Sequence, residues 1–142
     1  MKINIVFINA SQNRSGTTSR MGQNYLNGRK YQQINLVDYK IYQINQSYSD
    51  DQFDEVFAKL QQADWIILGT PAYWHYMSGY LKTFIERIGQ SKDFNTLADK
   101  KISVFIQGTD PTDAIKQVTD VIARFASVAN MNFVDIQEQF IN

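Results

Sequence analysis

The sequence predicts an α/β fold built on one doubly wound parallel sheet, with five strands and with helices packed on both faces. One observation supports this fold class, and a second supports a single domain. Short apolar runs alternate with segments of helical periodicity along the whole chain, in the order β-α-β-α-β-α-β-α-β. No repeat, low-complexity tract or linker divides the 142 residues, so we expect residues 1–142 to form a single domain.

The predicted strands are short runs rich in β-branched and aromatic residues, at 3–8, 31–37, 65–69, 102–106 and 133–136. The runs at 65–69 and 102–106 are continuously apolar, which is typical of central strands covered on both faces. In the last run, apolar Val134 and Ile136 alternate with polar residues, and only residues 137–142 follow. We therefore expect the usual final helix to be missing and a second copy of the chain to cover the exposed face.

Four segments have the apolar spacing of amphipathic helices. The first begins near Thr17 and ends at the Asn27-Gly28 pair, a common signal for the end of a helix. The second follows Asp50 and Asp51, whose charges favour a helix N-terminus. The predicted inward faces of the second, third and fourth helices are Phe53, Val56, Phe57 and Leu60; Leu81, Phe84, Ile85 and Ile88; and Val118, Val121, Ile122 and Phe125.

The composition excludes several classes of function. Lys and Arg total 14, as do Asp and Glu, so no basic excess indicates nucleic acid or an anionic membrane as a partner. The absence of cysteine excludes disulfides, thiolate chemistry and cysteine-ligated metals, and any histidine-based metal site or triad would depend on His75 alone. With no signal peptide and no apolar run of membrane-spanning length, we expect a cytoplasmic protein.

Three loops follow predicted strands at the carboxyl edge of the sheet, where open α/β sheets bind ligands. The loop at 9–18 is rich in hydroxyl groups and runs into a helix N-terminus, whose free N–H groups favour an anion. This pattern favours a phosphate monoester; the alternative is that Ser15 or Thr17 only caps the helix. The loop contains neither the Gly-Lys-Ser/Thr ending of a P-loop nor a G-x-G-x-x-G sequence, which favours a mononucleotide.

The second loop, at 71–79, is aromatic. Its four flat rings belong to Tyr73, Trp74, His75 and Tyr76, and they suit a planar ligand, because stacked rings attract one another. The alternative is that these residues belong to the core or to a subunit contact. A third loop, at 108–110, supplies small and polar groups for the edge of a ring. A phosphate site and a ring site on neighbouring strands together describe FMN.

These residues resemble a known family. Residues 10–18 (Ala-Ser-Gln-Asn-Arg-Ser-Gly-Thr-Thr) resemble the phosphate loop of flavodoxin-like NAD(P)H-dependent FMN reductases, whose usual form is Gly-Ser-x-Arg-x-x-(Gly/Ser)-x-Thr. Residues 69–87 resemble the family's Ser-Pro-x-Tyr segment and the Leu-Lys-x-(Phe/Leu)-Ile-Asp-Arg helix that follows it. The chain departs from the pattern by having Asn13 in place of the family arginine, with Arg14 one position later. It also contains none of the cysteines found in the related iron–sulfur flavoproteins.

The resemblance implies a flavodoxin-like three-layer sandwich of strand order 2-1-3-4-5, with FMN as cofactor. It implies hydride transfer from NAD(P)H through FMN to a small acceptor such as a quinone or free flavin. Because a flavin performs this chemistry itself, no catalytic side chain and no metal are expected. The implied ligands of the phosphate are Ser11, Asn13, Ser15, Gly16, Thr17 and Thr18. The implied contacts of the flavin ring are Pro71, Ala72, Tyr73, Trp74, His75 and Met77, with Gly108 and Thr109 at its far edge.

Other uses of the same fold remain open. A non-enzymatic electron carrier of the flavodoxin type is one, although such carriers are usually markedly acidic and this chain has zero net charge. A binding or regulatory domain that has lost the flavin is another. His75 either donates a hydrogen bond to the flavin or acceptor, or lies exposed at the loop tip. Zero net charge does little to separate copies of the chain, so we expect a homodimer or a higher homo-oligomer.

Overall fold

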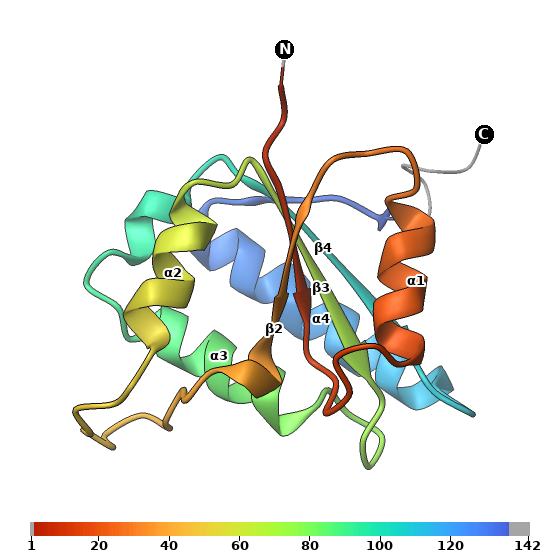
Figure 1. Ribbon diagram of the computed structural model, residues 1–142, viewed down its shortest axis with the longest axis horizontal. Coiled ribbons are helices and arrows are strands. Elements are labelled where there is room, and N and C mark those ends of the chain that lie inside the picture. The colour runs from red at the N-terminus through yellow and green to blue at the C-terminus, as the bar shows by residue number, and fades with distance from the viewer. Residues whose placement is uncertain (1, 137–142) are drawn as a thin grey trace.

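The computed structural model describes residues 2–136 and confirms the predicted fold class. Its five strands pair only in parallel, in the expected order β2-β1-β3-β4-β5 (Figure 1). The strands are β1 (Ile5–Asn9), β2 (Gln32–Asn35), β3 (Trp65–Pro71), β4 (Lys101–Gln107) and β5 (Asn132–Phe133). The helices are α1 (Thr17–Tyr25), α2 (Phe53–Gln61), α3 (Gly79–Gly89) and α4 (Thr112–Ala129), with short 3-10 turns η1 (Leu36–Asp38) and η2 (Phe94–Leu97).

Alternating side chains of the central strands divide the core into two clusters. Val6, Ile8, Ile66 and Leu68 pack with α2, α3 and α4, and the residues between them pack on the face covered by α1 (Figure 1). Both faces of β3 are buried along its whole length, as the continuous apolar run predicts. The sheet therefore holds the carboxyl ends of β1, β3 and β4 side by side.

A close contact fixes the position of α1 on the sheet. Gly22 lies directly over the ring of Phe7, and a Cβ atom on Gly22 would come within 2.3 Å of Phe7 Cε2. Gly69 on β3 leaves room for the same ring, since a Cβ there would lie 2.8 Å from Phe7 Cε1. Because real Cβ contacts are longer than this, only glycine allows α1 to approach so closely. The start of α1, which carries the predicted phosphate loop, is placed by this contact.

Every predicted strand differs from the observed one at an end, and the differences at the second and last strands have a structural reason. The second strand ends at Asn35 rather than at residue 37, because the chain turns into η1. The last strand comprises Asn132–Phe133 rather than residues 133–136. Ser103 Oγ donates a hydrogen bond to the Val134 carbonyl at 2.7 Å, and Ile136 is buried in the cluster on the α1 face. The side chain of Ile136 thus packs on the sheet instead of extending it. The predicted absence of a final helix concerns residues 137–142, which lie outside the described residues.

The segment 39–52 connects η1 to α2 without a helix or strand and is fastened by one arginine. Arg87 Nη1 on α3 lies 2.6 Å from Asp51 Oδ2 and 2.7 Å from the Tyr42 carbonyl oxygen. Its guanidinium also lies 4.7 Å from the centre of the Phe53 ring. The side chains of Arg87 and Asp51 are both largely shielded from water. A shielded charge is costly unless it is paired, so the ion pair holds the two residues together. This arginine therefore anchors a segment that borders the candidate site.

Candidate functional site

The three predicted loops meet at the carboxyl edge of the sheet and are joined by hydrogen bonds. The Gln12 N–H donates to the Tyr73 hydroxyl at 3.4 Å and links the first loop to the second. The Ala72 N–H donates to the Gln107 carbonyl at 2.7 Å and links the second loop to the third. Thr18 Oγ1 lies 3.4 Å from Gln107 Oε1 and closes the set. Residues 11–18, 71–79 and 107–110 therefore form one continuous surface.

The first loop is held by a buried asparagine that the sequence analysis did not select. Asn9, at the end of β1, is fully buried. Its amide donates to the Asn13 carbonyl at 3.1 Å and to Asn35 Oδ1 at 3.0 Å, while its own Oδ1 accepts the Ser11 N–H at 3.2 Å. A buried amide with its hydrogen bonds satisfied fixes the surrounding backbone. The signal available in the sequence was a polar residue ending an apolar strand.

The N-terminus of α1 carries unsatisfied donors. Gly16 is the N-cap residue, no described side chain caps the helix, and its first turn contains no acidic residue. Among the described residues, nothing accepts the N–H groups of Thr17, Thr18 and Ser19. Three such donors at the positive end of a helix form a site for an anion.

The predicted phosphate ligands occupy two kinds of position. Asn13, Ser15 and Thr17 are exposed beside the start of α1, and Gly16 is half-buried. Ser11 and Thr18 are buried. Ser11 Oγ accepts the Asn13 N–H at 3.0 Å, and the Thr18 hydroxyl bonds to Gln107. The exposed residues are therefore placed to meet a ligand directly, whereas Ser11 and Thr18 shape the loop.

Two arginines lie at this loop, and they face in different directions. Arg14 forms an ion pair with Asp38 at the end of η1. Arg20 points back along α1, where Nη1 donates to the Ser15 carbonyl at 3.3 Å and Nη2 donates to Thr17 Oγ1 at 3.2 Å. Arg14 belongs to the loop that resembles the family motif, whereas Arg20 lies beyond it and was not predicted. The signal for Arg20 was a cation in the first turn of a helix that has no acidic residue there.

The second loop is a tight hairpin. Tyr73 and Tyr76 exchange backbone hydrogen bonds of 2.9 and 3.1 Å around a two-residue turn. The turn residues Trp74 and His75 have φ values of 52° and 64°, the left-handed conformation of a type I′ turn. Such turns favour Asn and Gly, so this pair of bulky residues stores backbone strain. Strain of this kind is common at ligand-binding segments.

The rings of the hairpin differ in exposure. Trp74 is 96% exposed at the tip, and Tyr73 is half-buried between the first loop and the start of α3. His75 is also exposed, with Nδ1 3.9 Å from Asp113 Oδ2 on α4. Pro71 is buried and Ala72 half-buried, whereas Met77 lies in the main core with 3% exposure. Trp74, His75 and Tyr73 are thus accessible to a ligand, and Met77 supports the hairpin from below.

The remaining predicted residues lie close to the hairpin. Gly108 is half-buried, and a Cβ atom on it would come within 3.2 Å of the Ala72 Cβ. Thr109 is exposed next to it. The base of the hairpin is held by Thr70, whose Oγ1 accepts the Ser78 N–H at 2.9 Å, while Ser78 Oγ caps α3 by accepting the Leu81 N–H. The structure therefore brings all three groups of predicted residues to one edge.

A tyrosine-rich cavity of about 490 Å³ adjoins the hairpin. The residues that line it are Leu36, Tyr39, Lys40, Ile41, Tyr42, Gln43, Tyr73, Gly79, Tyr80 and Thr83. At its rim, Asp50 accepts hydrogen bonds from the Tyr42 hydroxyl at 2.9 Å and from Lys40 at 3.2 Å. These bonds stabilise the carboxylate, so they lower the pKa of Asp50, and the bond to Asp50 raises the pKa of Tyr42.

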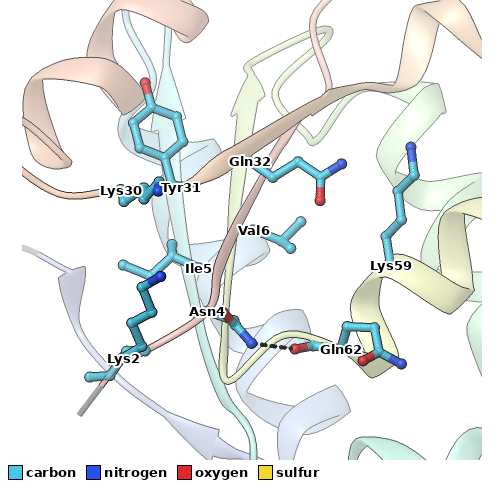
Figure 2. A pocket seen from close by; sticks show the side chains of 10 residues that line it. Lys2, Asn4, Ile5, Val6, Lys30, Tyr31, Gln32, Lys59 and Gln62 are labelled. Carbon is cyan, nitrogen blue, oxygen red and sulfur yellow. Dashed lines mark hydrogen bonds between the residues drawn. The ribbon is translucent and has the colours of Figure 1, made fainter.

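A second large cavity lies at the opposite, amino edge of the sheet (Figure 2). It has a volume of about 500 Å³, and Lys2, Lys30 and Lys59 are among its lining residues. Figure 2 shows Asn4 Nδ2 pointing at the Gln62 carbonyl oxygen, 3.3 Å away, with Lys59 on the opposite side of the view from Lys2 and Lys30. Ligands of doubly wound sheets bind at the carboxyl edge, so size alone does not make this cavity the functional site.

Within residues 2–136, the structure contains no group of three or more His, Asp or Glu side chains arranged to hold a metal ion. The same residues include no helix that is long and apolar enough to cross a membrane.

Comparison with known proteins gives a family match over nearly the whole chain. Residues 3–141 match the profile of a family described as NADPH-dependent FMN reductase. A putative NAD(P)H-dependent FMN-containing oxidoreductase of Bacillus subtilis (strain 168), YwqN, is 30% identical over 111 residues, which cover 72% of this chain and 59% of that protein. The chain thus spans about three fifths of the length of this curated relative.

Solved structures show the same fold. The Trp repressor binding protein from Bacillus subtilis has a TM-score of 0.75 at 24% identity, over 92% of this chain and 83% of that one. A flavone reductase has a TM-score of 0.78 at 20% identity, over 94% and 52% of the two chains. A WrbA-like flavodoxin from Agrobacterium tumefaciens has a TM-score of 0.71 at 21% identity, over 94% and 77%. At these identities the similarity concerns the fold alone.

Proposed function

The chain belongs to the NADPH-dependent FMN reductase family, and from this premise we propose that it binds FMN at the carboxyl edge of its sheet and acts as an NAD(P)H-dependent oxidoreductase. The observation that carries the proposal is the junction of the three loops through Gln12–Tyr73, Ala72–Gln107 and Thr18–Gln107. It joins a site for an anion to a site for a planar ring, which are the two ends of FMN.

The residues at the phosphate end fit the group. The free N–H groups at the start of α1 and the exposed side chains of Asn13, Ser15 and Thr17 would hold it. Each hydrogen bond to a charged group contributes about 1.5–3 kcal/mol, so a few of them retain a phosphate without a lysine. Ser11 and Thr18 would act through the loop, which they keep in shape together with Asn9.

At the ring end, Tyr73, Trp74 and His75 are the accessible side chains, and Gly108 and Thr109 lie at the neighbouring edge. FMN, when bound there, supplies the redox chemistry, which is uptake of a hydride from NAD(P)H and its delivery to an acceptor. The protein's part is to stack on the ring, orient it and exclude water from one face. Because the flavin carries out the redox chemistry, the proposed reaction requires no catalytic side chain.

We propose a small planar acceptor, such as a quinone or free flavin. The support is the tyrosine-lined cavity beside the hairpin, which shares Tyr73 with the ring site. Planar conjugated molecules stack favourably on tyrosine rings.

The proposed assembly is a homodimer or larger homo-oligomer, supported by the zero net charge and the almost fully exposed Trp74. Light scattering at micromolar concentration tests the assembly, and a monodisperse monomer would contradict it.

An absorbance spectrum tests the proposed function. Protein mixed with FMN and freed of excess should retain the flavin bands, and anaerobic NADH or NADPH should bleach them. Bands that persist with both nucleotides would favour a non-enzymatic electron carrier. Loss of all flavin on desalting would contradict the proposal and indicate a flavodoxin-like domain with another use.

A further inference from the structure

The start of α1 has an electrostatic arrangement that is unfavourable without a ligand. A helix N-terminus is positively polarised, so acidic residues stabilise it and cations destabilise it. The first turns of α2 and α4 follow this rule with Asp54, Glu55 and Asp113. The first turn of α3 also lacks an acidic residue, but the Ser78 side chain caps it. The first turn of α1 has neither an acidic residue nor a side-chain cap, and it contains Arg20, which adds a positive charge to the positive end.

Arg20 has no opposite charge to balance it. Among the described residues, no carboxylate oxygen lies within 4.0 Å of its guanidinium, whereas Arg14 on the same loop is paired with Asp38. The contacts of Arg20 are instead to neutral oxygens, the Ser15 carbonyl at 3.3 Å and Thr17 Oγ1 at 3.2 Å. These two atoms flank Gly16, the N-cap residue.

We infer that Arg20 is the phosphate-positioning cation of this chain, an inference that rests on the proposed binding of FMN. Its guanidinium ties Ser15 to Thr17 across the N-cap residue, and so it fixes the backbone from which the free N–H groups of α1 project toward the phosphate. A guanidinium has five N–H donors in a planar fork, and the two used here leave others for an anion. Arg20 thus supplies the positive charge that Asn13, standing where related sequences have arginine, does not supply.

Equilibrium titration with FMN and with riboflavin, followed by flavin fluorescence, tests this inference. Riboflavin has the same ring system and no phosphate, so it separates the two ends of the site. We expect Arg20→Gln to weaken FMN binding about tenfold or more, as loss of a hydrogen bond to a charged group predicts. Riboflavin binding should change less than about twofold. The matched control, Arg14→Gln, removes the same charge from a position where Asp38 already neutralises it, and should change both affinities only slightly.

A second variant and the salt dependence sharpen the test. Arg20→Lys keeps the charge and loses the fork, so it should recover part of the FMN affinity. The difference between wild type and Arg20→Gln should shrink as salt is raised, because screening weakens an exposed charge. An unchanged ratio of the FMN and riboflavin affinities in Arg20→Gln would overturn the inference. Equal weakening of both flavins would mean that Arg20 has a structural role. If wild-type protein binds neither flavin, the proposed function itself fails.

Discussion

The two halves of the candidate site are built in opposite ways. The loop at 9–18 is shaped by buried polar contacts around Asn9, and it presents mainly backbone N–H groups. The hairpin at 73–76 stands out from the edge of the sheet, and it presents side chains on a turn with two left-handed residues. One half is fixed by the core beneath it, and the other is fixed at its base by Thr70 and Ser78 and at its side by the hydrogen bond from Gln12 to Tyr73.

This difference indicates how each half meets a ligand. Backbone donors held by a buried amide need no rearrangement, so the phosphate end is preorganised. An indole that is 96% exposed on a strained turn gains most of its contacts only when something covers it. We therefore expect the phosphate loop to determine how firmly the nucleotide is anchored, and the hairpin to adapt to the ring and to the partner on its other face.

The largest expected effect comes from Asn9→Ala, which breaks the preorganised half. The change leaves the Ser11 N–H and the Asn13 carbonyl without their partner. Asn35 Oδ1 loses one of its two hydrogen bonds and keeps the one from Gln33 Nε2. Buried groups that lose their hydrogen bonds cost about 1–3 kcal/mol each, so the free energy of unfolding should fall by about 3 kcal/mol in urea titrations. Asn13→Ala is the control, because its side chain is exposed, and should change stability by less than about 0.5 kcal/mol. Equal stability of the two variants would contradict a preformed loop.

An intermediate effect is expected from Gly22→Ala, which displaces α1 without touching any polar contact. The new methyl group would meet the Phe7 ring, and overpacking of this kind costs about 2 kcal/mol. FMN affinity should fall with it, because the free N–H groups move with the helix. Gly89→Ala, at the end of α3, meets nothing within 4 Å and should be neutral or stabilising by about 0.5 kcal/mol. Thermal unfolding measures the stability of both variants. A destabilised Gly89→Ala together with an unchanged Gly22→Ala would contradict the close contact between α1 and the Phe7 ring.

The smallest effect is expected at the hairpin, where His75→Gly relieves the left-handed backbone at φ 64°. We expect the protein to become more stable by about 1 kcal/mol, since glycine adopts this conformation without strain. Trp74→Ala retains the strain and should show no such gain, while it weakens riboflavin binding by about 1–3 kcal/mol through lost stacking. Chemical denaturation and flavin titration of the two variants measure these opposite outcomes. A His75→Gly variant that is less stable than wild type would show that the turn is not strained.

The sequence predicts the fold, and the meeting of the three loops at one edge of the sheet, better than the residues that hold these loops in place. The parallel sheet, the hydroxyl-rich loop and the aromatic loop follow from composition and periodicity, whereas the strand order follows from the family resemblance. The loops meet because parallel strands bring their carboxyl ends together. Asn9 and Arg20 escape prediction because their roles depend on neighbours brought by folding, Asn35 on β2 and the turn at Gly16. The last strand is predicted too long because the alternation of Val134 and Ile136 imitates a strand, whereas Ile136 packs onto the sheet. Met77 was predicted to contact the flavin ring and instead lies in the core, because its burial depends on where the hairpin bends.

The central claim is that the two ends of FMN occupy these two halves of the site. Amide chemical-shift mapping by NMR, with riboflavin and then with FMN added to the same ¹⁵N-labelled protein, tests it most directly. We predict that riboflavin shifts amides of the hairpin, residues 72–76, and leaves those of residues 16–19 nearly unchanged. FMN should shift both groups, with the largest additional changes at Thr17, Thr18 and Ser19. Equal shifts from the two flavins at residues 16–19, or FMN shifts gathered around Lys2, Lys30 and Lys59 at the opposite edge, would contradict the assignment.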